Sequence, residues 1–242
     1  MKVKYFISVI FAIAVITFSL QSKIFAQTSI TPPEFTLEGS MWEQMEIDDV
    51  EDFLKEFARY PEYVSSWDLV GTVVVDFVVT TEGEVANINI INSVSNELDA
   101  EMIRLVEGTS GMWIPGKIDG SPAPLKKEVA LTFTPDPNYD PVKIAKEHMD
   151  KGNQELFGKN NPKRALTHYN KAVTILPYEK DLLSLRSLCY YDLGKKEEAR
   201  RDWERIINLN LEDRSQLETG YLIVKMKDLE GYEEFQRALA AQ

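Results

Sequence analysis

The second half of the chain repeats itself with a period of 34 residues, and this period restricts the fold more than any other feature. Positions one period apart share small, aromatic or apolar side chains: Ala165 with Ala199, Tyr169 with Trp203, Ala172 with Ile206, and Pro177 with Leu211. Small residues at the first of these positions and aromatic residues at the second allow two helices to pack closely. The period therefore predicts stacked helix pairs over residues 142–242.

This pattern resembles the tetratricopeptide repeat (TPR). Pro162 is expected just inside a helix, where its missing N–H costs nothing, after a loop one residue longer than usual. The segment from Leu217 onward fits either a degenerate third repeat or a C-terminal cap. The resemblance implies a helix-lined groove that binds peptides, with four lining residues: Asp181, Ser184, Leu188 and Tyr191.

A proline-rich stretch, TPDPNYDP at residues 134–141, separates two regions of very different charge. Residues 27–140 contain 6 basic and 22 acidic side chains, whereas residues 141–242 contain 18 basic and 17 acidic ones. So acidic a region repels phosphate backbones, and nucleic-acid binding is not expected. Because proline interrupts regular elements, residues 136–141 are predicted to link a domain at 41–135 to the helical domain at 142–242.

The first 26 residues have the composition of an export signal. Lys2 and Lys4 precede an apolar run from Tyr5 to Leu20, and Ala26 suits the position before a cleavage site. The run is shorter than the roughly 20 residues that span a bilayer comfortably. A cleaved signal peptide is favoured, and a retained N-terminal membrane anchor is the alternative. Either way, the remainder is expected in the periplasm.

Residues 27–40 are expected to form a short flexible leader before an α+β domain. The apolar spacing within residues 41–57 predicts a helix that begins near Asp48 and Asp49 and stops before Pro61. The β-branched runs 71–79 and 85–94 predict a hairpin with Gly83 in its turn. A helix capped by Asn96 and a strand at 126–133 follow, which predicts one small antiparallel sheet with helices on one face.

The segment MWIPGKIDGSP, residues 112–122, crosses from the second helix to the last strand. Trp113 is expected to hold this crossing against the core, and Pro115, Gly116, Gly120 and Pro122 to shape its turns. Nothing in the segment is chemically reactive. It is therefore interpreted as a rigid connector that presents the following strand.

The order and spacing of these residues resemble the TonB C-terminal domain, in the version common in Bacteroidetes-type envelope proteins. The resemblance extends over residues 50–135. It rests on Tyr60, Pro61, Gly71, Val73, Val75, Phe77, Gly83, Val85, Leu98, Asp99, Glu101, Trp113, Pro115, Gly116, Gly120, Pro122 and Phe133.

The resemblance implies a periplasmic domain whose last strand region pairs with a short segment of an outer-membrane receptor or with another copy of itself. Physically, this is the addition of a strand to an open sheet edge. The residues expected to form that edge are Lys127, Glu128, Val129, Ala130, Leu131, Thr132 and Phe133.

The sequence contains no recognisable catalytic or metal-binding constellation. His148 and His168 fall in different predicted helices without carboxylate or cysteine companions at ligand spacing, so solvated helix-face positions are favoured. Cys189 lies on an apolar helical stripe and is interpreted as a core residue rather than a nucleophile. No enzyme activity, metal or cofactor is expected.

We therefore expect a non-enzymatic periplasmic adaptor related to TonB-dependent transport, which binds one partner at its sheet edge and another in its repeats. Possible partners include TonB-dependent receptors or other envelope proteins. Two alternatives remain open. One is a membrane-anchored TonB-type energy transducer, and the other is a structural scaffold that forms homodimers through its sheet edge.

Overall fold

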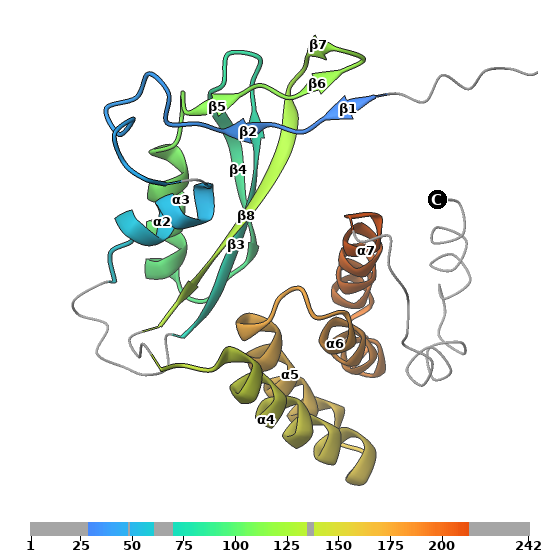
Figure 1. Ribbon diagram of the computed structural model, residues 1–242. Helices are drawn as coiled ribbons and strands as arrows, with labels where there is room; N and C mark the ends of the chain where they lie inside the picture. Colours follow the sequence, from blue (N-terminus) through green and yellow to red (C-terminus); the bar gives the residue numbers. More distant parts are fainter. Residues whose placement is uncertain (1–28, 48, 61–69, 135–137, 213–242) are drawn as a thin grey trace, which may run out of the picture.

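The computed structural model describes residues 29–47, 49–60, 70–134 and 138–212 (Figure 1). The predicted signal segment, Pro61 and the predicted C-terminal cap lie outside the described residues. The predicted fold class is confirmed, because a small antiparallel sheet with two helices is followed by a region that contains helices alone.

The main sheet contains three antiparallel strands in the order β4-β3-β8. They are β3 (Gly71–Val79), β4 (Val85–Asn92) and β8 (Leu125–Phe133). The central strand β3 is buried on both faces over its first five residues, which suits its run of valines. Gly83 forms the β3–β4 turn with φ of 81°, and a side chain there would collide with the carbonyl oxygen of Trp113. The turn therefore requires glycine.

Helices α2 (Val50–Phe57) and α3 (Asn96–Glu107) cover one face of this sheet. The carboxylate of Asp49 caps α2 by accepting the N–H of Asp52 at 2.8 Å. The predicted cap of α3 was wrong by one residue, because the Ser95 hydroxyl accepts the Leu98 N–H at 3.3 Å and Asn96 is the first helical residue.

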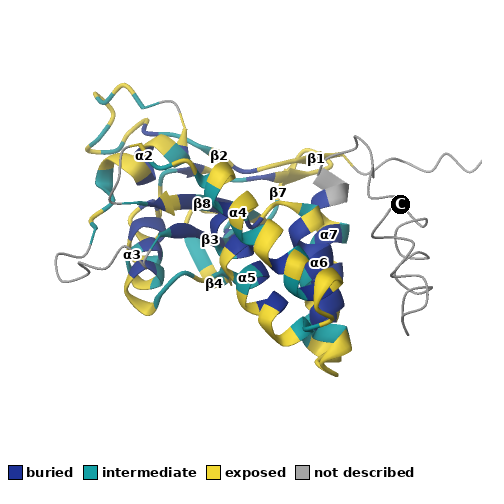
Figure 2. Ribbon diagram, turned by 90° about the horizontal axis from the view of Figure 1, so that it is seen from below, coloured by how far each residue is buried: buried dark blue, intermediate teal, exposed yellow. Residues whose placement is uncertain are grey.

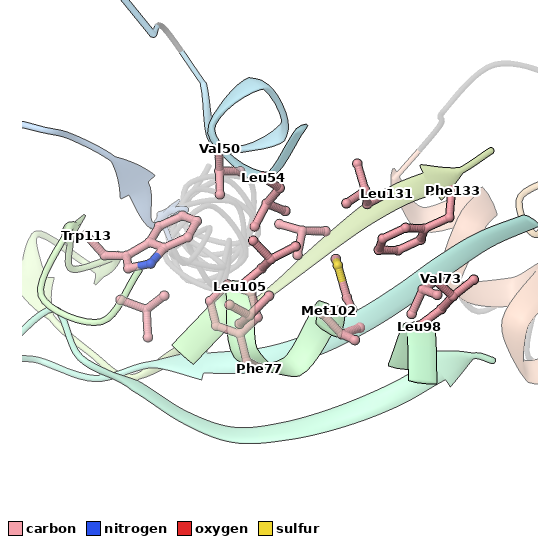
Figure 3. Packing of buried hydrophobic residues seen from close by; sticks show 14 residues of the cluster. Val50, Leu54, Val73, Phe77, Leu98, Met102, Leu105, Trp113, Leu131 and Phe133 are labelled. Carbon is pink, nitrogen blue, oxygen red and sulfur yellow. The ribbon is translucent and has the colours of Figure 1, made fainter. Parts of the chain in front are cut away.

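The core of this region lies between the two helices and the sheet (Figure 3). Side chains from α2, β3, α3 and β8 meet there, including Leu54, Phe77, Met102 and Leu131. Each of these side chains is at most 5% exposed. Burial on this scale is the main source of stability for a small sheet.

The prediction of a flexible leader at residues 27–40 was partly wrong. Two short strands of the leader, β1 (Ile30–Thr31) and β2 (Glu34–Phe35), pair antiparallel with β6 (Lys117–Ile118) and β5 (Trp113–Ile114) of the crossing segment. A third short strand, β7 (Ser121–Pro122), pairs with β6. The ring of Phe35 lies 5.5 Å from the rings of Phe53 and Trp113, so apolar contact fixes this part of the chain.

The second region consists of the helix pairs that the 34-residue period predicts. They are α4 (Pro141–Asn153) with α5 (Pro162–Ile175), and α6 (Lys180–Asp192) with α7 (Lys196–Glu212). A π-helical turn, Gln154–Gly158, extends α4, and such a turn absorbs the extra residue predicted before Pro162. The repeated positions are core residues, since Ala165, Tyr169 and Ala199 are each 0% exposed.

The helical region packs against the face of the sheet that α2 and α3 leave open. In Figure 1, α2 and α3 lie to the left of the sheet and α5–α7 to its lower right. The Thr72 hydroxyl donates to the carbonyl of Ile175 at 2.8 Å, and the Asn92 amide donates to that of Thr174 at 3.3 Å. Val74, which points to this face, is 0% exposed. Buried residues occur in the strands and in α5–α7 alike (Figure 2).

Candidate protein-interaction site

Strand β8 contains the seven residues that the sequence suggested as a docking edge, and it forms one edge of the sheet. Its nine residues pair with β3 in unbroken register, from Gly71 opposite Phe133 to Val79 opposite Leu125. Within the described residues, β8 has no strand neighbour on its other side. An edge strand of this length presents a row of backbone groups to an incoming chain.

The hydrogen bonds of β3 show which peptide groups of β8 point outward. The Thr72 carbonyl accepts the Asn92 side-chain amide, and the Thr80 N–H donates to the Glu84 carbonyl, so even-numbered residues of β3 face β4. Odd-numbered residues of β3 therefore face β8 and bond to its odd-numbered residues.

The N–H and C=O groups of four β8 residues consequently point away from the sheet. These residues are Lys126, Glu128, Ala130 and Thr132. Among the described residues, no other segment forms a backbone hydrogen bond with them. Four outward peptide groups are enough to pair with a short extended segment.

The side chains of β8 are divided between the two faces of the sheet. Val129, Leu131 and Phe133 are at most 5% exposed and pack in the core beneath α2 and α3. Glu128 points to the opposite face, toward the helical region. Because the odd-numbered residues are buried, the strand is fixed in register, and its open edge is rigid rather than frayed.

The crossing segment holds the start of β8 in place. Trp113 is 4% exposed, and its indole N–H donates to the buried Thr109 hydroxyl at 3.0 Å. Gly116 accepts the N–H of Ala123 at 2.9 Å. A Cβ at Gly116 would lie 2.6 Å from the Leu125 side chain and 2.9 Å from the Thr31 carbonyl oxygen, so the close approach requires glycine.

The other residues of the TonB-like motif lie outside the docking edge, in the core, in a connection or at the contact with the helical region. Tyr60 packs against the core, and burial raises the pKa of its hydroxyl. Pro115 lies between β5 and β6. Gly71 starts β3 at the contact with the helical region, where a Cβ would lie 2.8 Å from Thr174 Cγ2 and 2.9 Å from its carbonyl oxygen.

The predicted groove in the helical region is not formed as expected. Ser184 and Leu188 are each 6% exposed, and Leu188 packs in a core cluster that joins α5 to α6. Only Asp181 is exposed, while Tyr191 is half-buried with its ring 6.4 Å from that of Trp203. The first helix pair covers Leu188, and Ser184 is also buried, so the four residues do not line one open groove.

A cleft between the sheet and the helices was not foreseen from the sequence. Its volume is about 790 Å³, and its walls come from β3, β4, β8, α5, α6 and α7. Arg205 of α7 makes two hydrogen bonds of 2.6 Å to the two carboxylate oxygens of Glu128. The Arg205 guanidinium also lies 5.2 Å from the centre of the Tyr178 ring. A local sequence motif could not reveal this pair, because its two residues are 77 positions apart.

The two histidines lie close together, contrary to the expectation of separate solvated positions. The rings of His148 in α4 and His168 in α5 have centroids 6.0 Å apart. Both Nδ1 atoms are buried without a hydrogen-bond partner, and burial lowers the pKa of His148. The residues that the structure describes contain no group of three or more potential metal ligands.

Cys189 is 0% exposed, and burial raises the pKa of its thiol to about 12. A thiol in such surroundings stays protonated and is a poor nucleophile. Among the described residues, no helix combines the length and apolar character needed to cross a bilayer.

The comparison with protein families agrees with the resemblance of the first region. Residues 58–135 match the family model described as the Gram-negative bacterial TonB protein C-terminal. The solution structure of the Helicobacter pylori TonB C-terminal domain is 14% identical, with a TM-score of 0.29. The match covers 38% of this chain and 92% of that one.

Among curated proteins, the Hsp70-Hsp90 organizing protein of Triticum aestivum is 39% identical over 72 residues. This match covers 30% of the present chain. The chain spans only 12% of the length of that relative.

Proposed function

We propose that this chain is a non-enzymatic adaptor of the bacterial cell envelope, located in the periplasm. It captures an extended segment of a partner protein, such as a TonB-dependent receptor, by adding it as a fourth strand to the sheet beside β8. The family match of residues 58–135 supports a role in TonB-related transport. We further propose that α4–α7 are TPR repeats that hold a second protein partner.

The observation that supports strand capture most strongly is the open edge of β8. Its four outward peptide groups lie on a strand whose other side is bonded to β3 over nine residue pairs. Because β8 is already ordered, this protein would lose little conformational entropy when a guest strand binds. Backbone hydrogen bonds would supply affinity, and alternate side chains would supply selectivity.

A capture experiment with a proline substitution tests this function. Ala130→Pro removes an outward N–H and places a ring on the docking edge, without removing a hydrogen bond to β3. Ala130→Ser keeps the N–H and serves as the matched control. The immobilised chain from residue 27 onward is incubated with envelope extract, and captured proteins are identified by mass spectrometry.

We expect the unsubstituted chain and Ala130→Ser to retain a common set of envelope proteins that Ala130→Pro loses. Capture that persists in Ala130→Pro would contradict docking at β8 and would move the binding site to the helical region. Circular dichroism of each variant verifies that the fold is intact.

A further inference from the structure

We propose that His148 and His168 together bind one transition-metal ion of the class that prefers imidazole ligands, such as Zn²⁺, and that this ion joins helix α4 to helix α5. Imidazole nitrogen suits Zn²⁺, Cu²⁺ and Ni²⁺, whereas Mg²⁺ and Ca²⁺ prefer oxygen ligands. The site belongs to the first helix pair and uses no residue of β8, so it is independent of the proposed capture of a strand.

The first argument is the distance between the two rings. Their centroids lie 6.0 Å apart, and their planes are inclined by 31°. A ring nitrogen ligates zinc at about 2.0–2.1 Å, and the ring centre lies about 1 Å beyond that nitrogen, so two rings that share one ion have centres about 5–6 Å apart. The observed distance is at the upper end of this range. The two helices therefore already have the spacing that a shared ion requires.

The second argument is that neither ring is engaged in a hydrogen bond. Both Nδ1 atoms are buried without a partner, and within the described residues no hydrogen bond involves either Nε2 atom. A neutral imidazole has a lone pair on one nitrogen and a proton on the other, whichever tautomer is present. In each histidine this lone pair is therefore available to an ion. Buried polar atoms without a partner are uncommon and call for an explanation such as a water molecule or an ion.

The charged side chains around the two rings act in opposite directions. Four of them interact electrostatically with His148 or His168, namely Lys151, Lys171, Glu147 and Glu155. The lysines disfavour a cation and the glutamates favour it, so the affinity should depend mainly on the two imidazoles. In the part of the chain that the structure describes, no third side chain completes a ligand set. Water would fill the remaining coordination positions, and the ion would exchange readily.

The test is a titration of the chain from residue 27 onward with zinc chloride, followed by isothermal titration calorimetry and by NMR of the imidazole protons. The chain contains only two histidines, so substitution assigns both imidazole signals. His148→Gln and His168→Gln each remove one ligand. Lys151→Gln is the matched control on α4, and magnesium chloride tests whether carboxylates bind the ion instead. Circular dichroism of each variant verifies that the fold is intact.

We expect one zinc ion per chain, with both imidazole signals shifting at the same dissociation constant. Either histidine substitution should weaken zinc binding by about tenfold or more, because the second imidazole binds an ion that the first already holds. Lys151→Gln should preserve or tighten binding, and Mg²⁺ should shift neither signal.

Equal zinc affinity in His168→Gln and the unsubstituted chain would overturn the shared site and assign the binding to carboxylates. A shift confined to one ring, or the absence of zinc binding, would overturn it as well. None of these results would affect strand capture, because Ala130→Pro should bind zinc as the unsubstituted chain does.

Discussion

At the scale of single residues, the packing of the helical region requires a residue without a side chain at Gly152, which lies against the Tyr169 ring. A Cβ at Gly152 would lie 2.7 Å and 2.9 Å from two carbons of the Tyr169 ring. The ring cannot move away freely, because Tyr169 is 0% exposed and its hydroxyl donates to Asn153 Oδ1 at 2.8 Å. The repeat pattern identified Tyr169 as a packing position, but only the structure shows its partner.

We predict that Gly152→Ala destabilises the chain by about 1–3 kcal/mol, as expected for overpacking in a close-packed core. Gly158→Ala is the control, since its nearest neighbour would be 3.9 Å away. Equilibrium denaturation in urea gives both free energies of unfolding. Because alanine favours a helix more than glycine does, helix propensity alone would make both substitutions neutral or stabilising. Equal effects of the two substitutions would show that the Tyr169 contact does not determine the cost.

The second prediction at this scale concerns the pH dependence of stability. Burial is the main cause of the lowered pKa of His148, and Lys151, Lys171 and His168 lower it further against the opposing effect of Glu147. Because the folded-state pKa lies below the unfolded value, this histidine contributes stability that is present above about pH 6.5 and is lost as the pH falls through the folded-state pKa.

His148→Gln should therefore reduce the fall in melting temperature between pH 7.5 and pH 5. Differential scanning calorimetry at several pH values measures this slope. A slope that is identical in the variant and the unsubstituted chain would show that other groups control acid destabilisation.

At the scale of elements, periodicity and turn chemistry predicted the three strands of the sheet almost residue by residue. The run from Gly71 to Val79 has no competing interpretation, because its β-branched residues lie between two turn signals. The cap of α3 was harder to predict. Ser95 and Asn96 are both good caps, and only backbone geometry selects the first. The leader was mispredicted because its partners, β5 and β6, are about 80 residues away and local patterns contain no information on them.

Proline substitutions at two neighbouring residues of β8 should also differ in their effect on the sheet. Val129 N–H bonds to β3, so Val129→Pro breaks the sheet and should cost about 2–3 kcal/mol. Ala130 N–H points outward, so Ala130→Pro should cost under about 1 kcal/mol. Thermal unfolding followed by circular dichroism measures both. A larger loss in Ala130→Pro than in Val129→Pro would reverse the assignment of the outward edge.

At the scale of the whole molecule, the sheet and the helices form a shared interface. Gly71, Thr72 and Asn92 meet the end of α5, and Glu128 meets α7. Glycine and β-strand patterns indicate local conformation but not which distant surface covers a strand, so this interface could not be predicted. The groove residues in α6 were mispredicted for a related reason. The 34-residue period identifies equivalent positions, but it does not show that the first helix pair buries Leu188.

A double-mutant cycle measures how strongly the two regions are joined. We predict a coupling energy of about 1–2 kcal/mol between Glu128→Gln and Arg205→Gln, because the pair is bidentate and largely buried. The pair of Lys126 with Asp76 provides the comparison. Its lysine is 70% exposed, so its coupling should be about 0.5 kcal/mol or less. Equal coupling in the two cycles would indicate that the contact between the regions is not specific.

The most direct test of the account is amide hydrogen exchange along β8 in the free protein, resolved by residue with NMR. Strand capture requires that one set of N–H groups is bonded to β3 and that the other set is open to solvent. We predict slow exchange at Lys127, Val129 and Leu131, and fast exchange at Lys126, Glu128, Ala130 and Thr132. Slow exchange at all seven residues would show that another part of the chain already covers this edge, and would contradict the docking of a partner strand there.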